Sequence, residues 1–372
     1  MAARRKKKSK LMTAIWGLMT LVASGGVGGY LDPDLPILGP MVSQLHLREV
    51  VKTAGLPEDG QELAERFKDL RSGSASSAQG GIPSPGGVVA TPAAAVQRPA
   101  DKIRIATFNI QVFGESKIGK PDVVDVLAQV VRRFDVVAIQ EIRTKKDTLM
   151  PRFLEKVNQG GGQYNFLIGP RLGRSVSTEQ YVYIYDTTRV EYDPSSVGTM
   201  SDPTDLLHRE PYVARFRAKT SVPEKGFTFW LVNIHTDPDE VPQEIDVLAD
   251  VFQVMQTARA DEDDVILLGD LNANEKQFGR LGEIPGMSWV VRGDVMTNTR
   301  RNRAYDNLLF EQSATAEYTG TWGVLDLEET FGLTRDQALK VSDHLPVWAE
   351  FDAQEATAGR PKITGRDRLL NR

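Results

Sequence analysis

Cysteine is absent from the 372-residue chain, and its absence excludes several classes of site. Without cysteine there is no disulfide framework, no thiolate zinc site and no cysteine nucleophile. The sequence also lacks a glycine-rich phosphate loop and an HExxH pair, which argues against a nucleotide triphosphatase and a zinc protease. The compartment stays open, because an exported protein can fold without disulfides.

A chain-wide excess of basic residues is missing as well. The formal net charge is −5, and it is unevenly spread. Residues 1–100 carry a net charge of +4 and residues 353–372 carry +3, whereas residues 101–352 carry −12. Domains that bind nucleic acid over a broad surface are usually basic. Any contact of this chain with a nucleic acid must therefore use local basic loops or bound cations.

The N-terminus combines a basic flank with a long uncharged run. Residues 4–10 read RRKKKSK, and the 21 residues Leu11–Leu31 that follow carry no charge. A run of this length is enough to cross a hydrocarbon core of about 30 Å, and the basic flank predicts a cytoplasmic N-terminus. We therefore expect a signal-anchor helix in residues 1–31, with the rest of the chain outside the cytoplasm. The small residues at 22–24 leave a cleaved signal peptide, and hence secretion, as the alternative.

Composition divides the rest of the chain into four parts. Residues 32–71 are predicted to form a short helical segment, and residues 72–100, rich in Ser, Gly, Ala and Pro, a flexible linker. Residues 101–352 are predicted to be one α/β domain with layered sheets, and residues 353–372 a basic tail. The predicted strands are Ile103–Phe108, Val136–Ile139, Val182–Tyr185, Val213–Phe216, Phe227–Ile234, Val265–Leu268, Tyr305–Phe310 and Val347–Phe351. Helices are predicted near 121–133, 147–158 and 241–258.

Six short segments place polar side chains beside the ends of apolar strands. They are Thr107-Phe108-Asn109, Gln140-Glu141, Asn233-Ile234-His235, Gly269-Asp270-Leu271-Asn272, Ala304-Tyr305-Asp306 and Ser342-Asp343-His344. A strand end lets a rigid sheet hold side chains at fixed spacing over a cleft. Taken singly, each segment is more often a turn or a helix cap. Six of them in one domain favour a functional site.

Hydrolysis of a phosphodiester needs the residue types that these segments supply. Carboxylates hold a hard divalent cation, which takes oxygen ligands and neutralises charge on the phosphate. A histidine can exchange protons near neutral pH, and neutral amides can orient a phosphate without adding negative charge. The residues that meet these needs are Glu141, Asp270, Asp343, His235, His344, Asn109 and Asn272.

The ordered set of segments resembles the endonuclease/exonuclease/phosphatase superfamily over about residues 102–352. Three further segments bring the resemblance closest to deoxyribonuclease I. They are Leu172-Gly173-Arg174-Ser175 followed by Glu179 and Tyr181, then Arg209-Glu210-Pro211, and Phe331-Gly332-Leu333. The resemblance implies a four-layer α/β/β/α sandwich with the site at one edge of two packed sheets. It also implies an Mg²⁺- or Mn²⁺-dependent endonuclease acting on DNA, and gives no indication of an obligate protein partner.

The resemblance assigns a role to each matching residue. It implies Glu141 as the principal metal ligand, with Asn109 and Asp343 nearby. Asn272 would bind phosphate, and Asp270 would position or deprotonate the attacking water. Two pairs, His235 with Glu179 and His344 with Asp306, would supply the acid and the base in an order that stays open; each carboxylate would orient its imidazole and favour the protonated form. The expected substrate contacts are Arg143, Arg174 and Arg209.

The sequence departs from the family at three points. Ser177 stands where the family carries a tyrosine that packs in the minor groove, and the family's disulfides are absent. The family's calcium loop is only partly present, with Asp205, the Leu207 carbonyl and Glu210 as expected ligands. Two other functions remain open: a phosphatase or phospholipase-like enzyme of the same superfamily, which the acidic domain and the N-terminal hydrophobic run favour, and a non-catalytic, membrane-tethered binding module.

Overall fold

The computed structural model describes residues 98–174 and 178–356, which form a mixed α/β fold with two multi-stranded sheets. The first sheet has, in spatial order, β12 (Tyr318–Val324), β13 (Val347–Asp352), β1 (Lys102–Phe113), β2 (Val136–Ile142), β4 (Gln180–Asp186) and β3 (Tyr164–Ile168). The second has β10 (Met287–Trp289), β11 (Asp306–Glu311), β9 (Val265–Asp270), β8 (Thr228–His235), β7 (Tyr212–Ala218) and β5 (Val190–Tyr192), with β6 (Gly198–Thr199) paired to β7. The sequence analysis predicted this mixed class correctly.

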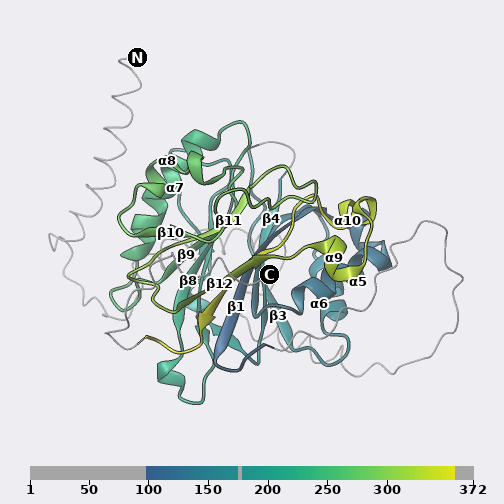
Figure 1. Ribbon diagram of the computed structural model, residues 1–372, viewed down its shortest axis with the longest axis horizontal. Helices are drawn as coiled ribbons and strands as arrows, with labels where there is room; N and C mark the ends of the chain where they lie inside the picture. Colours follow the sequence, from purple (N-terminus) through teal and green to yellow (C-terminus); the bar gives the residue numbers. More distant parts are fainter. Residues whose placement is uncertain (1–97, 175–177, 357–372) are drawn as a thin grey trace, which may run out of the picture. The chain divides into compact units, whose positions relative to one another are not determined.

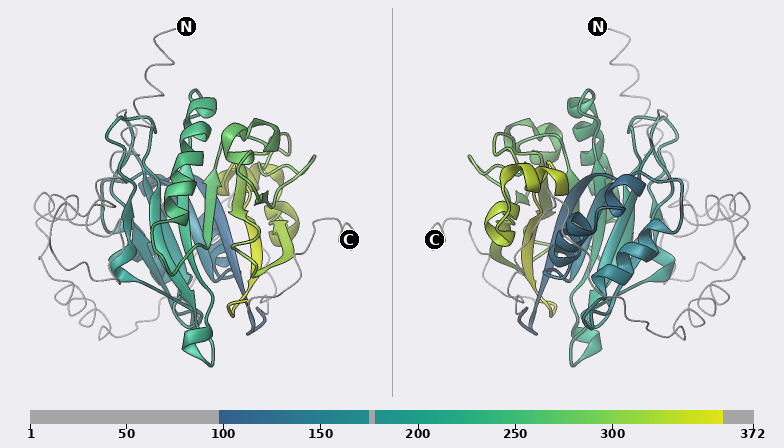
Figure 2. Two further views of the ribbon diagram at one scale, coloured as in Figure 1. Left: turned by 90° about the vertical axis from the view of Figure 1, so that its left-hand side faces the viewer. Right: turned by 90° about the vertical axis from the view of Figure 1, so that its right-hand side faces the viewer.

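The two sheets pack face to face, and helices lie on both outer faces (Figure 1, Figure 2). An aromatic-rich core that includes Phe216, Phe229 and Phe351 fills the space between the sheets. A second apolar core joins the first sheet to α4 (Glu115–Ile118), α5 (Pro121–Val131), α6 (Leu149–Val157), α9 (Leu327–Phe331) and α10 (Arg335–Val341). A third joins the second sheet to α7 (Val241–Gln256) and α8 (Gly279–Gly282). Both sheets are therefore rigid, buried supports for the side chains at their edges.

Local sequence explains the central elements. Strand β9 reads VILLGD and is buried throughout, because it lies beside the parallel strand β8 with apolar cores on both faces of its sheet. Helix α5 begins with Pro121, whose missing N–H costs nothing in the first turn, and it buries a wide apolar stripe against the first sheet. These elements hold the strand ends in place by ordinary core packing.

Two details of the sequence prediction are wrong. The predicted helices overrun the observed ones by one or two residues at most of their ends, the usual uncertainty where helices fray. Asn109 and Glu141 do not follow the ends of their strands, because β1 continues to Phe113 and β2 to Ile142. Pairing between β1 and β2 shifts register between Asn109 and Phe113, so both side chains sit at a bulge inside the sheet.

Several predicted segments lie outside the described residues. These are the membrane-spanning or signal segment at 1–31, the helical segment at 32–71, almost all of the linker at 72–100, and most of the tail at 353–372. Within residues 98–174 and 178–356, no helix is both long enough and apolar enough to cross a membrane.

Candidate active site

Three acidic or histidine side chains form one row across the end of the second sheet. In the sheet pairing, Asp270 on β9 is the register partner of His235 on β8 and of Asp306 on β11. Gly269 permits this close approach, because a Cβ at that position would lie 1.9 Å from the Ile234 carbonyl oxygen, and its φ of 151° suits glycine. The Gly-Asp motif of the sequence therefore encodes the spacing of the row.

Two imidazole rings point their Nε2 atoms at the Asp270 carboxylate. Its Oδ2 atom lies 3.5 Å from Nε2 of His235 and 3.5 Å from Nε2 of His344. The same oxygen accepts a hydrogen bond from Asn109 Nδ2 at 3.0 Å, and Oδ1 accepts one from the Asn272 backbone at 2.9 Å. Burial opposes ionisation of Asp270, but His344 and His235 outweigh it and lower the pKa of this carboxyl. Asp270 is therefore held as an anion.

The first imidazole is oriented by Glu179. His235 Nδ1 lies 2.7 Å from Glu179 Oε1, and the Glu179 side chain is fully buried. Burial alone would lower the pKa of His235, but the charge and hydrogen bond of Glu179 raise it above the ordinary value. Arg209 and Arg143 each place a guanidinium nitrogen 3.3 Å from a Glu179 oxygen. The predicted pair is thus present, and two arginines hold its carboxylate.

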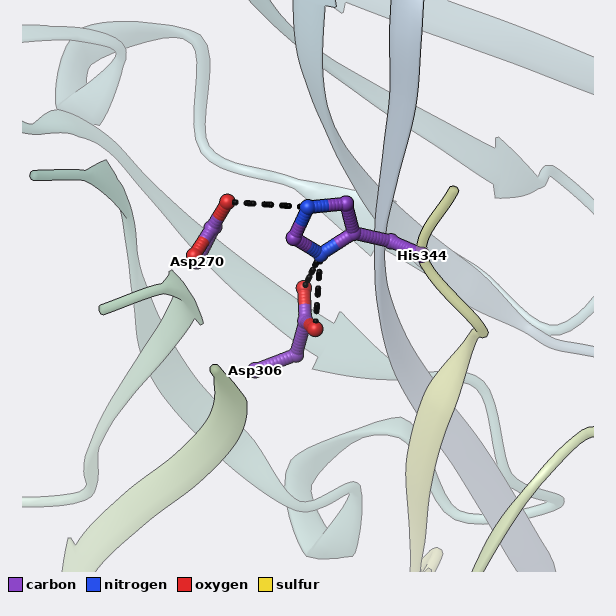
Figure 3. Close-up of side chains that lie close together, drawn as sticks. All are labelled: Asp270, Asp306 and His344. Atoms are coloured by element: carbon purple, nitrogen blue, oxygen red, sulfur yellow. Dashed lines mark hydrogen bonds and ion pairs between the residues drawn. The ribbon is translucent and has the colours of Figure 1, made fainter. Parts of the chain in front are cut away.

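The second imidazole is oriented by Asp306, as Figure 3 shows. His344 Nδ1 lies 2.9 Å from Asp306 Oδ2, which also accepts a hydrogen bond from the Thr297 hydroxyl at 2.7 Å. Burial of the ring opposes protonation, but the carboxylates of Asp306 and Asp270 raise the pKa of His344 well above its ordinary value. Both rings therefore present Nε2 toward Asp270 with Nδ1 fixed by a carboxylate.

The predicted metal-binding residues lie at the bulge beside this row. Glu141 contacts Asn109 Nδ2 at 3.3 Å and accepts a hydrogen bond from the Val112 backbone at 2.8 Å. Glu141 has a φ of 65°, a conformation that strands avoid and that functional sites often retain. Asp343 is 40% exposed at its side chain and lies 4.0 Å from His344 Nε2. Its buried Oδ1 atom has no hydrogen-bond partner among the described residues, which leaves an oxygen available to a cation.

A second set of potential ligands overlaps the acid–base groups. Asp270, Asp306 and His344 each offer one ligand atom, and these atoms lie within 4.8 Å of one another. This set differs from Glu141, Asp343 and Asn109, which the sequence predicted. The site therefore offers two ways to hold a divalent cation, both built largely from oxygen atoms.

Lys117 was not recognised in the sequence. Its ammonium donates hydrogen bonds to the carbonyls of Ile110, Gln111 and Val341, at 2.6, 2.6 and 2.8 Å. Burial lowers the pKa of Lys117 to about 8, opposed by the nearby carboxylates of Asp343 and Glu141. This lysine ties the bulge of β1 to the end of α10, and nothing in the short segment around it signals that role.

Three amide and hydroxyl side chains connect the two sheets beneath the site. Gln140 donates a hydrogen bond to Asn233 at 2.6 Å and another to Thr107 at 3.0 Å, and all three are fully buried. The Asn233 backbone N–H in turn donates a hydrogen bond to the Tyr183 hydroxyl oxygen at 3.1 Å. The sequence analysis quoted these residues within its motifs but gave them no role. They fix the register of one sheet against the other.

The structure gives the expected substrate-binding residues different surroundings. Arg209 is only 7% exposed at its side chain and donates to the His235 carbonyl at 3.0 Å, so it lies beneath the site and holds the His235–Glu179 pair. Arg143 is 27% exposed and also contacts Glu141. Arg174 forms ion pairs with Asp205 at 2.9 Å and Glu240 at 2.7 Å, and Asn272 donates to the Thr236 carbonyl.

The expected calcium ligands make other contacts in the structure, and the calcium site stays a prediction. Asp205 is occupied by the Arg174 guanidinium, and the loop is instead closed by Asp202, which accepts the backbone N–H groups of Leu206 and Leu207. Ser177 lies outside the described residues.

Comparison with known proteins identifies a family, two similar relatives and a similar solved structure. Residues 106–344 match the Endonuclease/Exonuclease/phosphatase family. The chain is similar to human deoxyribonuclease-1-like 1, with 33% identity over 275 residues that cover 70% of this chain and 88% of the relative. It is also similar to deoxyribonuclease gamma of Rattus norvegicus, with 29% identity, covering 69% of this chain and 86% of the relative. Among solved structures, a humanized D. rerio TDP2 with 14 mutations aligns at 16% identity and a TM-score of 0.48, covering 68% of this chain and 99% of that one.

Proposed function

The chain belongs to the Endonuclease/Exonuclease/phosphatase family, and from that premise we propose that it is a divalent-metal-dependent endonuclease that hydrolyses phosphodiester bonds in DNA. The proposal rests mainly on the position of two imidazole rings around Asp270. The Nε2 atoms of His235 and His344 each lie 3.5 Å from Asp270 Oδ2, and a carboxylate orients each ring. Hydrolysis needs one group to take a proton from water and one to give a proton to the leaving oxygen.

The three central residues divide the proton transfers of this reaction. Asp270 orients the attacking water or accepts its proton, because its carboxylate is anionic and faces both rings. One of His235 and His344 protonates the oxygen that leaves phosphorus, and the other stabilises the negative charge of the attacking group or takes its proton. Glu179 and Asp306 keep each ring in place and favour its charged form. The order of the two histidines stays open.

The predicted metal ligands are compatible with a hard divalent cation. We propose that Glu141 holds Mg²⁺ or Mn²⁺, with Asn109 and Asp343 beside it, and the unpartnered Asp343 Oδ1 supports this assignment. When bound, the cation would neutralise charge on the phosphate oxygens. Lys117 adds a positive charge behind the same carboxylates and secures the backbone that carries them.

DNA is proposed as the substrate because the relatives reported above are named deoxyribonucleases. The net charge of −12 in residues 101–352 opposes long-range attraction to DNA, so local arginines must supply the contacts. Arg143 and Arg174 are the proposed substrate contacts, with Asn272 toward the phosphate. For Arg209, its burial supports a role in positioning Glu179.

The proposed organisation places a catalytic domain at residues 101–352 behind a linker at 72–100. The uncharged run in residues 1–31 supports a membrane-anchored protein with this domain outside the cytoplasm, and cleavage after the run would give a secreted enzyme. The net negative charge of the domain favours one alternative function, that of a phosphatase or phospholipase-like enzyme of the same family.

A comparison of substrates tests the proposal. Purified residues 98–372 are incubated with supercoiled plasmid, a phosphomonoester and phospholipid vesicles, in Mg²⁺ or Mn²⁺ and in chelator. We expect nicked plasmid with either metal, none in chelator, and no release of phosphate or headgroup. Phosphate or headgroup release without nicking would favour the alternative function, and nicking that persists in chelator would contradict the metal mechanism.

A further inference from the structure

Three acidic side chains come together at the end of the sandwich opposite the candidate active site. Asp264 directly precedes β9, Glu317 directly precedes β12, and Glu355 follows β13. Each offers one carboxylate oxygen, and these atoms lie within 4.8 Å of one another. Asp264 lies six positions before Asp270 along the extended chain of β9, a distance of about 20 Å at about 3.3 Å per residue. This base cluster is therefore distinct from the catalytic groups.

The base cluster contains buried oxygen atoms that lack a partner. Asp264 is 6% exposed and Glu317 is 2% exposed. Asp264 Oδ1 and Glu317 Oε2 form no hydrogen bond of good geometry among the described residues; the Thr315 hydroxyl lies near the Asp264 carboxyl group, and the Glu355 carboxyl group lies near that of Glu317. A buried polar atom without a partner costs about 1–3 kcal/mol, and more when it is charged. Such oxygens are expected to have a ligand.

The remaining carboxylate oxygens of the base cluster are held by the backbone. Glu317 Oε1 accepts the Ala356 N–H, and Glu355 Oε1 accepts the Thr228 N–H and hydroxyl at 2.7 and 3.0 Å. Each glutamate therefore uses one oxygen to fix the chain, which leaves its other oxygen for the interior of the cluster. These hydrogen bonds therefore fix the positions of the Glu317 and Glu355 side chains without a bound ligand.

Within the described residues, no basic side chain forms an ion pair with Asp264, Glu317 or Glu355. Arg215, which lies near, is paired with Glu262 at 2.9 Å. Burial first, and then the carboxylates of Glu317 and Glu262, raise the pKa of Asp264 to about 10, and burial raises the pKa of Glu317 to about 7. In the absence of a cation, the cluster would be neutralised by protons.

We propose that Asp264, Glu317 and Glu355 bind a hard divalent cation of the Ca²⁺ class. All the candidate ligands are oxygen atoms, which excludes a preference for Zn²⁺ or Cu²⁺. Ca²⁺ accepts irregular sets of oxygens at 2.3–2.6 Å, so two ligands of one ion can stand nearly 5 Å apart. Mg²⁺ requires a near-ideal octahedron at 2.0–2.1 Å, a stricter demand than three side chains from separate strand ends meet easily.

The ion would connect the two sheets. Asp264 belongs to the second sheet, whereas Glu317 and Glu355 flank strands of the first, so a shared cation links them at their base. The Ala356 contact also places the last described residues of the chain at this point. The role of the site is therefore structural: Ca²⁺ raises the stability of the domain without touching the reacting groups.

The test uses the full chain, stripped of metal with chelator and then titrated with CaCl₂. We expect the midpoint of thermal unfolding to rise by about 5–10 °C when Ca²⁺ is 100-fold above its dissociation constant. Glu317→Gln and Asp264→Asn should each abolish this rise. Asp270→Asn, which removes a carboxylate of the candidate active site, should keep it, and so should Glu155→Gln on the exposed face of α6. A rise that survives in Glu317→Gln but disappears in Asp270→Asn would overturn the proposal.

A second measurement detects binding of the ion directly, without relying on thermal unfolding. Calorimetric titration of the wild-type chain with CaCl₂ near pH 7, in two buffers of different ionisation enthalpy, counts the protons displaced by the ion. We expect Ca²⁺ binding to be accompanied by release of protons, because burial favours the protonated form of these carboxyl groups. No Ca²⁺ binding to the Asp270→Asn chain, or binding that Glu317→Gln leaves unchanged, would contradict the proposed site.

Discussion

Replacement of Asp306 by asparagine should disable His344 while leaving the fold intact. The carboxylate lies 2.9 Å from His344 Nδ1 in a buried setting, and asparagine has nearly the same shape. Its carbonyl can still accept the Thr297 hydrogen bond, so the loss is mainly the negative charge that orients and protonates the ring. Positioned acid–base groups contribute about 10²–10⁴-fold in rate, which corresponds to about 3–5 kcal/mol of transition-state stabilisation.

The pH profile of Asp306→Asn should also reveal what His344 does. The carboxylates raise the pKa of His344, so removal of one of them lowers it. A general acid works below its pKa, and lowering that value moves the alkaline limb of the profile to lower pH. A general base works above its pKa, and the acid limb then moves to lower pH. The limb that moves identifies the role of this histidine.

Single-turnover nicking of supercoiled plasmid, measured over a range of pH, gives both the rate loss and the pH profile of Asp306→Asn. The double variant Asp306→Asn/His344→Ala should be no slower than His344→Ala alone, because Asp306 acts through the ring. Circular dichroism and thermal unfolding of each variant check the fold. Multiplicative losses in the double variant, or an unmoved pH profile, would refute the assignment of Asp306 as a positioning residue.

Three further predictions address the other parts of the account. His235→Ala should slow nicking by about 10²-fold or more, whereas His208→Ala should leave the rate within a few-fold in the same assay, since His208 lies outside the converging pairs. Ser177→Tyr should tighten DNA binding or sharpen cleavage preference, and Arg174→Ala should weaken binding and reduce its salt dependence; binding titrations at several salt concentrations check both, and silent changes would argue against docking in the groove. The full chain should fractionate with membranes because of residues 1–31, a shortened form in the medium would indicate signal cleavage, and a full-length cytosolic protein would contradict both expectations.

Much of the row formed by His235, Asp270 and Asp306 could be predicted from the sequence, because these residues lie at the ends of recognisable strands. Continuous apolar runs define β8 and β9, and the polar residues at their ends, His235 and Asp270, follow directly. Since the two strands are parallel and neighbouring, both residues reach the same edge of the sheet. Local pattern and spatial arrangement agree in this part of the molecule.

The bulge and the long-range contacts could not be predicted in the same way. Glu141 and Val112 adopt positive φ values that neither residue type favours, and only the surrounding contacts impose them. Strand β12 was missed because its sequence, YTGTWGV, has two glycines and little burial. Lys117 and the three acids of the base cluster contact residues that are far away in sequence. The spacing of residues along the chain therefore does not predict these contacts.

The measurement that tests the central claim most directly compares the wild-type chain with Asp270→Asn. Both are assayed for single-turnover nicking of supercoiled plasmid in Mg²⁺, after thermal unfolding has shown that both are folded. Because both imidazoles converge on Asp270, the proposed position of the attacking water, the account predicts that the wild type nicks the plasmid and that the variant loses at least about 10²-fold in rate. A folded Asp270→Asn variant that nicks as fast as the wild type would contradict the account.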